Sequence, residues 1–341
     1  MLDTQSAASF AEFRRIVAEF PGPDLASAAR AAEREGQLTK PTGALARLEE
    51  IAAWLCTWQA KHPPQVNHPR VAVFAGNHGV ADLGVSAYPK EVTQQMVLNF
   101  QGGGAAINQL CKNADADLRV YEMCLDQPTK DFTQGPALSE EETARAMAYG
   151  MMSVEPGVDL LCVGEMGIAN TTSASAIAAA LFGGTGTDWA GPGTGVKGAQ
   201  LTRKAEVIDQ GLARHRGAFR DGFEIMRCLG GHELAAIAGA VMAARIARVP
   251  VLLDGFASTA AASILLKSDV NALDHCLVAH CSAEPGHRRL LDKIGKKPLL
   301  DLGMRLGEAS GAALAIPIVR AAALCHAGMA TFAEAGVSDK E

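Results

Sequence analysis

The first part of the chain has the apolar spacing of amphipathic helices. Up to about residue 61, apolar positions recur every three or four residues, as they do on the buried face of a helix. This spacing predicts helices over residues 10–20, 25–35 and 43–61, the last opening after a Thr cap. A similar stretch covers residues 309–333, where we expect a break near Pro317 because proline has no amide hydrogen to donate inside a helix.

From residue 69 onward, short continuous apolar runs replace the helical spacing. Such runs are typical of parallel strands that are buried on both faces. They predict strands over residues 71–75, 118–123, 158–163, 249–254 and 276–280. Helical patterns lie between them, over residues 90–100, 140–151, 171–182, 201–211, 233–246 and 258–266.

The regular alternation of strand and helix predicts an α/β fold with a doubly wound parallel sheet. Right-handed crossovers should place helices on both faces of the sheet. A ligand should then bind beyond the carboxyl ends of the strands. We assign residues 66–309 to this large α/β domain, and residues 1–65 with 310–341 to a small helical domain built from both chain ends.

The charge balance argues against nucleic acid as a partner. The chain holds 31 Lys and Arg against 37 Asp and Glu, a net charge of −6 at pH 7, and its basic runs are no longer than two residues. Its first residues mix charged and apolar side chains, which does not fit a secretion signal. The weakly polar stretch 234–247 is too short to cross a membrane, so we expect no membrane span.

The eight cysteines and nine histidines are scattered along the chain. They form no CxxC pair and no HExxH motif, so we expect no metal centre. Cysteines within apolar runs of a chain this size are usually reduced core residues. We therefore expect a cytoplasmic protein.

Several predicted strands end in turns rich in Gly, Asn, Ser and Glu, where we look for chemistry. After the first strand, Ser86 and Gln94 offer hydrogen bonds to a ring nitrogen or a hydroxyl, although a capped turn beside a solvated helix is equally consistent. After the third strand, Glu165 stands at the strand end, and Asn170 and Thr171 stand at the next helix start. Free amides and hydroxyls there suit a phosphate, or serve as a plain cap.

Two later turns carry further polar groups. The glycine loop 191–195 precedes a helix with Arg203 and Lys204, which fits a phosphate cradle or a surface loop with a solvated cation. Ser282 and Glu284 could cap a helix that begins at the following proline.

Glu308 is an acid set among glycines and apolar residues. Burial there would raise the pKa of its carboxyl and suit it to proton transfer near neutral pH. The alternative is an acid that stabilises the dipole at a helix start. Together these turns indicate an enzyme that holds a phosphorylated small molecule and uses a carboxylate base.

A series of longer motifs runs nearly from one end of the chain to the other. In order they are KPTGAL, AGNHGV, VSAYPKEVTQQM, GEMGIANTT, GPGTG, LLDGFASTAA, HCSAEPGH and LGEASGAALA. In these motifs the chain closely resembles the nicotinate-nucleotide:dimethylbenzimidazole phosphoribosyltransferase family. Their shared order makes chance agreement improbable.

The resemblance implies a Rossmann-like large domain, a homodimer with active sites near the subunit interface, and no metal or organic cofactor. It also implies the reaction. Nicotinate mononucleotide gives its phosphoribosyl group to a nitrogen of 5,6-dimethylbenzimidazole, yielding α-ribazole 5'-phosphate and nicotinate with inversion at the anomeric carbon. This step activates the lower ligand of cobalamin for assembly of the nucleotide loop.

The resemblance also assigns roles to residues of this sequence. Glu308 corresponds to the general base, and Glu165 to a supporting carboxylate. Ser86, Gln94 and Met96 correspond to the pocket for the acceptor base. The phosphoribosyl and nicotinate side is assigned to Asn170, Thr171, Gly193, Thr194, Lys204 and Ser282.

Two positions depart from the usual residues of the family. Asn77 stands where Asp is usual, which would alter the electrostatics near the base pocket. Ala169 stands where Gly is usual, and it adds a methyl where we expect a positive φ. Alternative functions are transfer to another acceptor, such as adenine or a phenol, and nucleotide binding without turnover.

Overall fold

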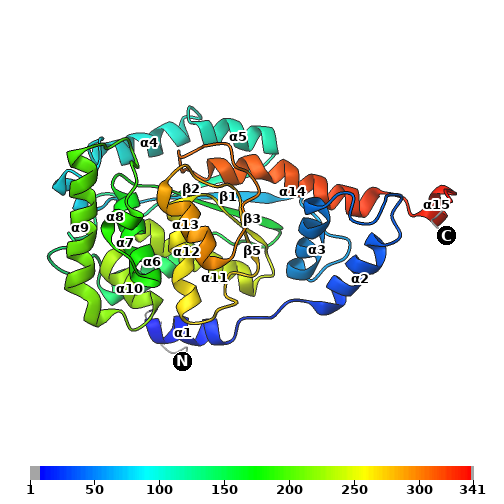
Figure 1. Cartoon of the computed structure of the whole chain (residues 1–341), viewed down its shortest axis with the longest axis horizontal. Coiled ribbons are helices and arrows are strands. Elements are labelled where there is room, and N and C mark those ends of the chain that lie inside the picture. The colour runs from blue at the N-terminus through cyan, green and yellow to red at the C-terminus, as the bar shows by residue number, and fades with distance from the viewer. Residues whose placement is uncertain (1–7, 339–341) are drawn as a thin grey trace, which may run out of the picture.

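A parallel sheet forms the centre of the molecule. The computed structural model describes residues 8–338, and within them five strands pair in the order β2-β1-β3-β4-β5. The strands are β1 (Pro69–Ala75), β2 (Asp117–Glu122), β3 (Leu160–Met166), β4 (Val251–Leu253) and β5 (Cys276–Val278). Each of the five overlaps a predicted strand, although several bounds differ by two or three residues, and the α/β fold with a parallel sheet is confirmed (Figure 1).

Alternate residues of the central strands enter two hydrophobic cores. In β1, Ala72 and Phe74 pack into one core, whereas Val71 and Val73 pack into the other. β3 divides its residues in the same way. Successive side chains of a strand point to opposite faces, so a strand covered on both faces is apolar at every position. This is why these segments appear in the sequence as continuous apolar runs.

One face of the sheet is covered mainly by α6 (Glu140–Met151), α11 (His232–Ile246) and α12 (Phe256–Ser263). Helices α6 and α11 approach each other closely because glycines stand at their contact. A Cβ at Gly150 would lie 1.9 Å from the Ala236 carbonyl oxygen, and a Cβ at Gly239 would lie 1.9 Å from that of Met147. Further helices on this side are α1 (Phe10–Ala18), α7 (Asn170–Phe182), α8 (Gly186–Trp189), α9 (Ala199–His215), α10 (Gly222–Leu229) and α13 (Pro285–Ile294).

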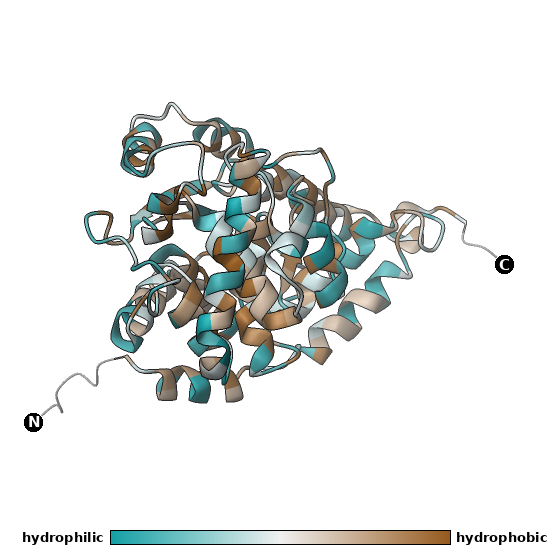
Figure 2. Cartoon of the chain, turned by 60° about the vertical axis from the view of Figure 1, so that its left-hand side comes forward, coloured by the Kyte–Doolittle hydropathy of each residue, from teal (hydrophilic) through white to brown (hydrophobic). Residues whose placement is uncertain are grey.

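The other face is covered by α3 (Arg47–Gln59), α4 (Glu91–Gln101), α5 (Ala106–Ala114) and α14 (Ser310–Gly328). Helix α14 runs from the sheet toward the end of the molecule that carries α2 (Leu25–Glu35) and α15 (Phe332–Ala335) (Figure 1). Hydrophilic and hydrophobic segments alternate along outer helices such as α2 (Figure 2). Short 3-10 helices span Gly79–Leu83, Arg216–Ala218 and Ile264–Lys267.

The two chain ends differ in what they pack against. Helices α2 and α3 lie together, and α3 packs against α14. Helix α1 packs on the large unit instead, where the rings of Phe10 and Phe223 lie 5.7 Å apart. The division of the chain into a small and a large domain stays a prediction, and residues 1–7 and 339–341 of its small domain lie outside the described residues.

Several helix ends differ from the prediction by a few residues, and two of the differences have a clear cause. Pro317 does not break α14, which continues from Ser310 to Gly328. Buried neighbours on both sides of it, including Ile316 and Val319, hold the helix, so packing offsets the lost hydrogen bond. The third helix begins at Arg47 and not at Gly43, because Ala46 has a φ of 44° and ends the preceding turn.

Helix α14 is long and apolar enough, by length and composition, to cross a membrane. Half of its apolar window is buried inside the protein. It packs against β1, β3, α3 and α5. Burial of this kind is typical of a core helix, which must be apolar on more than one side.

Candidate active site

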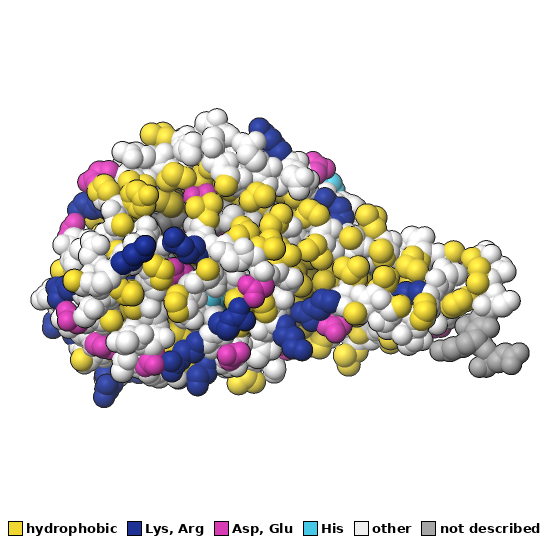
Figure 3. All heavy atoms as spheres, turned by 45° about the horizontal axis from the view of Figure 1, so that its top comes forward, with side chains coloured by type: hydrophobic (Ala, Val, Ile, Leu, Met, Phe, Trp, Pro, Cys, Tyr) yellow, Lys and Arg dark blue, Asp and Glu magenta, His cyan; other side chains and the backbone are white. Residues whose placement is uncertain are grey.

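A cleft opens at the carboxyl edge of the sheet, where β1 and β3 lead to opposite sides of it. This is the place where doubly wound sheets bind ligands, because the connections from adjacent strands diverge there. The cleft has a volume of about 470 Å³, the size of a small-molecule site. Figure 3 shows hydrophobic side chains gathered around a hollow, with basic side chains beside it.

Nearly all of the predicted site residues line this cleft. They are Ser86, Met96, Glu165, Asn170, Thr171, Gly193, Thr194, Ser282 and Glu308. Gln94 is not among the lining residues, and its side chain is exposed on α4. Lys204 is not among them either, because it lies behind the cleft wall with only 1% of its surface exposed.

A larger hollow of about 690 Å³ lies at the opposite edge of the sheet, beside the amino ends of β1 and β3. Its buried cation, Arg70, contacts the carboxylates of Asp117 and Glu155 at 2.9 and 3.0 Å. That cation is already paired, and none of the predicted site residues lines this hollow, so the smaller cleft is the candidate site.

Glu308 is presented to the cleft by a left-handed turn before α14. Gly307, Glu308 and Ala309 have φ values of 82°, 63° and 60°. A positive φ costs conformational free energy for residues that have a Cβ, such as Glu308 and Ala309. Contacts with the surrounding structure must therefore hold the turn in this conformation. The Glu308 amide donates to the Glu165 carbonyl oxygen at 3.0 Å, which ties the turn to the end of β3.

The Glu308 carboxyl is buried and only partly satisfied. Its Oε2 has no hydrogen-bond partner. Burial, followed by the nearby Asp254 carboxyl, raises the pKa of Glu308 to about 7. A carboxyl with a pKa near neutrality can both accept and release a proton at physiological pH, which is the requirement for a general base.

Glu165, the last residue but one of β3, lies beside this turn. A Cβ at Gly307 would approach its Oε1 to 2.7 Å, so the glycine allows the two segments to meet. The Asn170 side-chain amide donates to the Glu165 carboxylate. Burial raises the pKa of Glu165 well above its ordinary value, and the carboxyls of Asp254, Glu233 and Glu308 act in the same direction against the effect of Asn170.

The glycine loop 191–195 packs against a buried cation. Lys204 Nζ donates to Thr171 Oγ1 at 2.8 Å and to the Gly191 carbonyl oxygen at 2.9 Å. Gly193 has a φ of 51°, and a Cβ there would lie 2.7 Å from Thr171 Oγ1 and 3.1 Å from Lys204 Nζ. Burial lowers the pKa of Lys204 to about 8, so its ammonium is still mostly charged at pH 7.

Two charged residues at this end were not among the predicted site residues. Glu284 Oε1 accepts from the Gly193 amide at 2.8 Å, and Arg305 Nη1 donates to the Gly193 carbonyl oxygen at 2.6 Å. The sequence suggested a capping role for Glu284, but its side chain makes no cap bond at the start of α13. In the sequence, the only indication that Arg305 belongs to the site is its position three residues before Glu308.

Ser86 and Thr194 join the turn after β1 to the glycine loop. Ser86 Oγ and Thr194 Oγ1 lie 2.9 Å apart, and the Ala87 amide donates to Thr194 Oγ1 at 3.0 Å. The cleft lining also includes the apolar side chains of Val92 and Met96 from α4. The cleft therefore offers hydroxyls together with apolar side chains, which suits a flat heterocycle.

The two unusual residues lie in different environments. Ala169 lines the cleft at the start of α7 and has a φ of 74°, the positive value that we expect at this position. Asn77 does not line the cleft; its amide donates to the Leu125 carbonyl oxygen at 2.9 Å. Asn77 therefore makes a structural contact beside β1.

Known proteins with similar sequences and structures belong to one phosphoribosyltransferase family. A family model described as "Phosphoribosyltransferase" matches residues 20–337. A relative from Rhizobium meliloti (strain 1021) named nicotinate-nucleotide–dimethylbenzimidazole phosphoribosyltransferase is 57% identical over 98% of this chain and 99% of its own. The chain belongs to this family. A protein of the same name from Brucella canis is 56% identical over 98% of both chains.

Solved structures of this phosphoribosyltransferase family share the fold. A crystal structure of the enzyme from Thermus thermophilus is 41% identical, with a TM-score of 0.86, over 92% of this chain and 99% of that one. A structure of CobT from the same organism is 43% identical, with a TM-score of 0.88, over 92% of this chain and 100% of that one. The agreement therefore extends over nearly the whole of both chains.

Proposed function

We propose that this chain transfers the phosphoribosyl group of nicotinate mononucleotide to a nitrogen of 5,6-dimethylbenzimidazole, releasing nicotinate and α-ribazole 5'-phosphate. The observation that carries the proposal is the Glu308 carboxyl, which lies in the cleft with an unpaired oxygen and a pKa raised to about 7. The names of the relatives agree with this activity. In the cell it would supply the lower ligand for assembly of the cobalamin nucleotide loop.

The two ends of the cleft suit the two substrates. The phosphoribosyl group would lie against Gly193, Thr194, Asn170 and Thr171, with the Lys204 ammonium behind them, because amides, hydroxyls and a cation together favour an anion. Ser282 would complete this side. The acceptor ring would lie against Met96 and Ser86 at the more hydrophobic end, within reach of Glu308. Gln94 has no direct place in this arrangement.

The transfer needs one base and no acid. The bond between the anomeric carbon and the cationic pyridinium nitrogen breaks, and its electron pair leaves with nicotinate as a neutral ring nitrogen. One benzimidazole nitrogen forms the new bond to that carbon from the opposite face, which inverts its configuration. Glu308 accepts the proton from the other nitrogen. Glu165 would support the adjacent turn through the Glu308 amide.

Placement supplies much of the remaining rate enhancement. Holding two rings on opposite faces of one ribose converts a reaction between separate molecules into one within a complex. Each side of the cleft comes from a different connection of the sheet, and these connections are cross-bonded by Ser86 with Thr194 and by Glu308 with Glu165. The cleft is therefore a fixed frame for both substrates.

We further propose a cytoplasmic homodimer. All eight cysteines, which fall within the described residues, are free, and six of them are buried, as expected in a reducing compartment. Exposed hydrophobic side chains include Tyr88 and Leu306 in the cleft lining, with Leu98 and Leu302 close to them along the chain. A second copy of the chain covering them would place its interface beside the active site.

An acceptor panel tests the proposed reaction. The protein is incubated with nicotinate mononucleotide and, in separate reactions, 5,6-dimethylbenzimidazole, benzimidazole, adenine or phenol, while nicotinate release and product mass are measured. We expect the fastest release with 5,6-dimethylbenzimidazole and a product with the mass of α-ribazole 5'-phosphate. A reaction without acceptor corrects for hydrolysis. Preference for adenine or phenol would indicate the alternative acceptors, and tight nucleotide binding without release would indicate a binding protein.

A further inference from the structure

Asp254 lies directly behind the turn that presents Glu308, outside the lining of the cleft. It follows β4 without a gap, and its side chain is fully buried. Its Oδ1 accepts from the Ala312 amide at 2.9 Å. The proposed reaction gives this residue no direct contact with either substrate.

Asp254 serves as the cap of α14. The residue before that helix, Ala309, has a φ of 60° and makes no side-chain cap bond. The first amides of a helix have no partner within the helix, so they need an acceptor from elsewhere. Asp254 supplies one from 58 residues earlier in the chain. Because this bond holds Ala312 in the first turn of α14, it also supports the left-handed turn directly before the helix, on which Glu308 stands.

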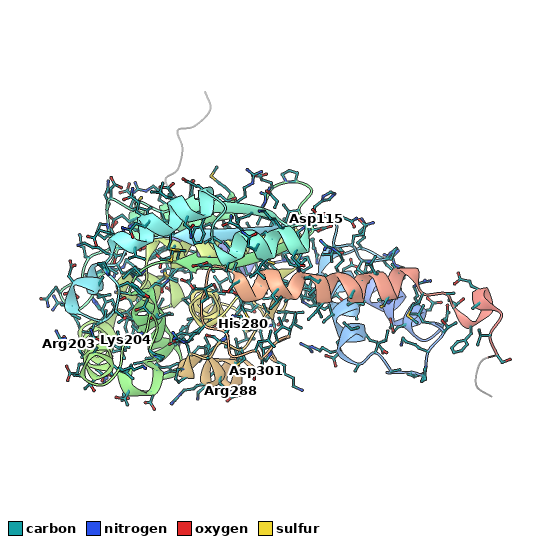
Figure 4. All side chains as sticks on the ribbon, turned by 90° about the horizontal axis from the view of Figure 1, so that it is seen from above. Asp115, Arg203, Lys204, His280, Arg288 and Asp301 are labelled. Carbon is teal, nitrogen blue, oxygen red and sulfur yellow. The ribbon has the colours of Figure 1, made fainter. Side chains whose placement is uncertain are left out.

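The groups that face Asp254 leave its charge uncompensated. His280, from the end of β5, has its Nε2 3.7 Å from Asp254 Oδ1. It lies inside the molecule, unlike Arg288 and Asp301 at the surface (Figure 4). Burial lowers the pKa of His280, so its ring is neutral near pH 7. The other titratable groups that interact with Asp254 are Cys162 and Glu165 on β3 and Glu308 itself, which are acids.

Asp254 and Glu308 are therefore two neighbouring carboxyls without a cation between them. Each keeps one buried oxygen, Oδ2 and Oε2, without a hydrogen-bond partner. The charged side chains of Arg305 and Glu284 are bonded to Gly193 in the glycine loop. Two such carboxyls do not ionise independently, because the first negative charge opposes the second.

We propose that Asp254 is a positioning residue for Glu308: its hydrogen bond to the start of α14 fixes the turn that carries the base, and its charge increases the affinity of that base for a proton. The inference rests on the proposed transfer. The negative charge of Asp254 makes Glu308 a stronger base for the benzimidazole proton and stabilises the protonated carboxyl that the step produces. The proton moves from the ring nitrogen to Glu308, and no covalent bond between heavy atoms changes at Asp254.

The test separates the charge of Asp254 from its hydrogen bond. Asp254→Asn keeps an oxygen that can accept from the Ala312 amide but removes the charge. We expect its kcat/KM at high pH to stay within about fivefold of wild type, while the acid limb of the pH profile moves down by on the order of one pH unit. Asp254→Ala, which lacks the acceptor, should lose at least about tenfold in kcat at every pH.

Asp159→Asn is the matched control. Asp159 also accepts backbone amides, from Asn67 and His68 at 2.6 and 2.9 Å, but at the other edge of the sheet. The acid limb of the kcat/KM profile of Asp159→Asn should coincide with that of wild type. An acid limb in Asp254→Asn that also coincides with wild type would overturn the proposal. A wild-type protein without transferase activity would instead refute the proposed function.

A carboxyl titration by NMR tests the interaction between the two carboxyls without turnover, and without relying on the fold of an Asp254 variant. The protein is labelled with 13C at the aspartate carboxyls, and the signal that titrates nearest neutrality is followed. In Glu308→Gln this signal should titrate at a lower pH than in wild type, because the neighbouring negative charge is gone. The same titration curve in both proteins would show that the two carboxyls are independent.

Discussion

At the scale of single residues, the environment of each acid decides what it can do. Glu308 and Asp254 are chemically ordinary carboxyls, but burial raises the pKa of each to about 7. An exposed acid such as Asp188 behaves in the opposite way, because hydrogen bonds from Thr185 hold its pKa below the ordinary value. The buried carboxyls of Glu308 and Asp254 can therefore change their protonation state near neutral pH, whereas an exposed carboxyl cannot.

Glu308→Gln should abolish most of the turnover while leaving nucleotide binding nearly intact. The amide has almost the same shape but cannot accept a proton, so we expect kcat to fall by on the order of 10² or more. The dissociation constant for nicotinate mononucleotide, measured by calorimetry, should change by no more than about threefold. Turnover close to that of wild type would remove Glu308 from the role of base.

The pH dependence of wild type follows from the same group. Glu308 must be deprotonated to act as a base, and its pKa is raised to about 7. We expect kcat/KM to be constant above pH 8 and to fall tenfold for each pH unit well below pH 7. A steady-state pH profile measures this limb. A limb centred near pH 4.5 would mean that Glu308 titrates as an exposed carboxyl.

Lys204→Met should weaken the nucleotide side selectively. It removes a buried ammonium that donates to Thr171 and Gly191, and a charge-assisted hydrogen bond contributes roughly 1.5–3 kcal/mol. We expect the KM for nicotinate mononucleotide to rise at least about tenfold, with little change in the KM of the acceptor. Arg203→Met is the control, since Arg203 is the preceding residue on α9 and pairs with Glu206 at the surface. Equal effects of both variants would argue against a specific role for Lys204.

At the scale of elements, the site is built from the connections that follow parallel strands. The turns after β1, β3, β4 and β5 all meet at one edge, because every strand of the sheet points the same way. The glycine loop before α9 and the turn before α14 complete the cleft. The glycines in these connections matter where two backbones or a backbone and a side chain approach closely.

Gly193→Ala tests such an approach. The new methyl would meet Thr171 Oγ1 at 2.7 Å and Lys204 Nζ at 3.1 Å, so we expect a rise of at least about fivefold in the KM for nicotinate mononucleotide. Gly198→Ala shares nearly the same φ, 52° against 51°, but has no heavy atom within 4 Å of the new methyl. It should lose stability through backbone strain, because Gly198 also has a positive φ, and keep the KM. A matching rise in both would mean that backbone strain alone is responsible.

At the scale of the whole molecule, the proposed homodimer gives a direct prediction. The chain has a mass of 35.6 kDa, so light scattering coupled to gel filtration should report about twice that value. Leu98→Asp, on the exposed side of α4 beside the cleft, should shift the mass toward the monomer. Val270→Asp is the control, because Val270 is also exposed but lies between α12 and β5, away from the cleft lining. A monomeric wild type would contradict the dimer.

The periodicity of apolar residues was enough to predict the five strands and most of the helices. Strands such as β1 are recognisable because both of their faces are buried, and the apolar run follows from that burial. The exceptions have local causes. Helices α5 and α10 have amphipathic spacing, but with 9 and 8 residues each is too short for the spacing to stand out, while α14 continues through Pro317 because its neighbours are buried. Local spacing does not report how strongly the tertiary contacts support a segment.

The sequence alone determined the parallel α/β architecture, the edge of the sheet at which chemistry should occur, and, through its motifs, the family. These depend on short-range spacing and on turns, which are visible in a few consecutive residues. Only the tertiary structure decided that Glu284 bonds to Gly193, 91 residues away, and that Asp254 caps the helix behind Glu308. It also showed that Gln94 does not line the cleft and that Lys204 is buried behind the cleft wall. Such contacts depend on which connections the strand order brings together. Local sequence spacing does not specify that order.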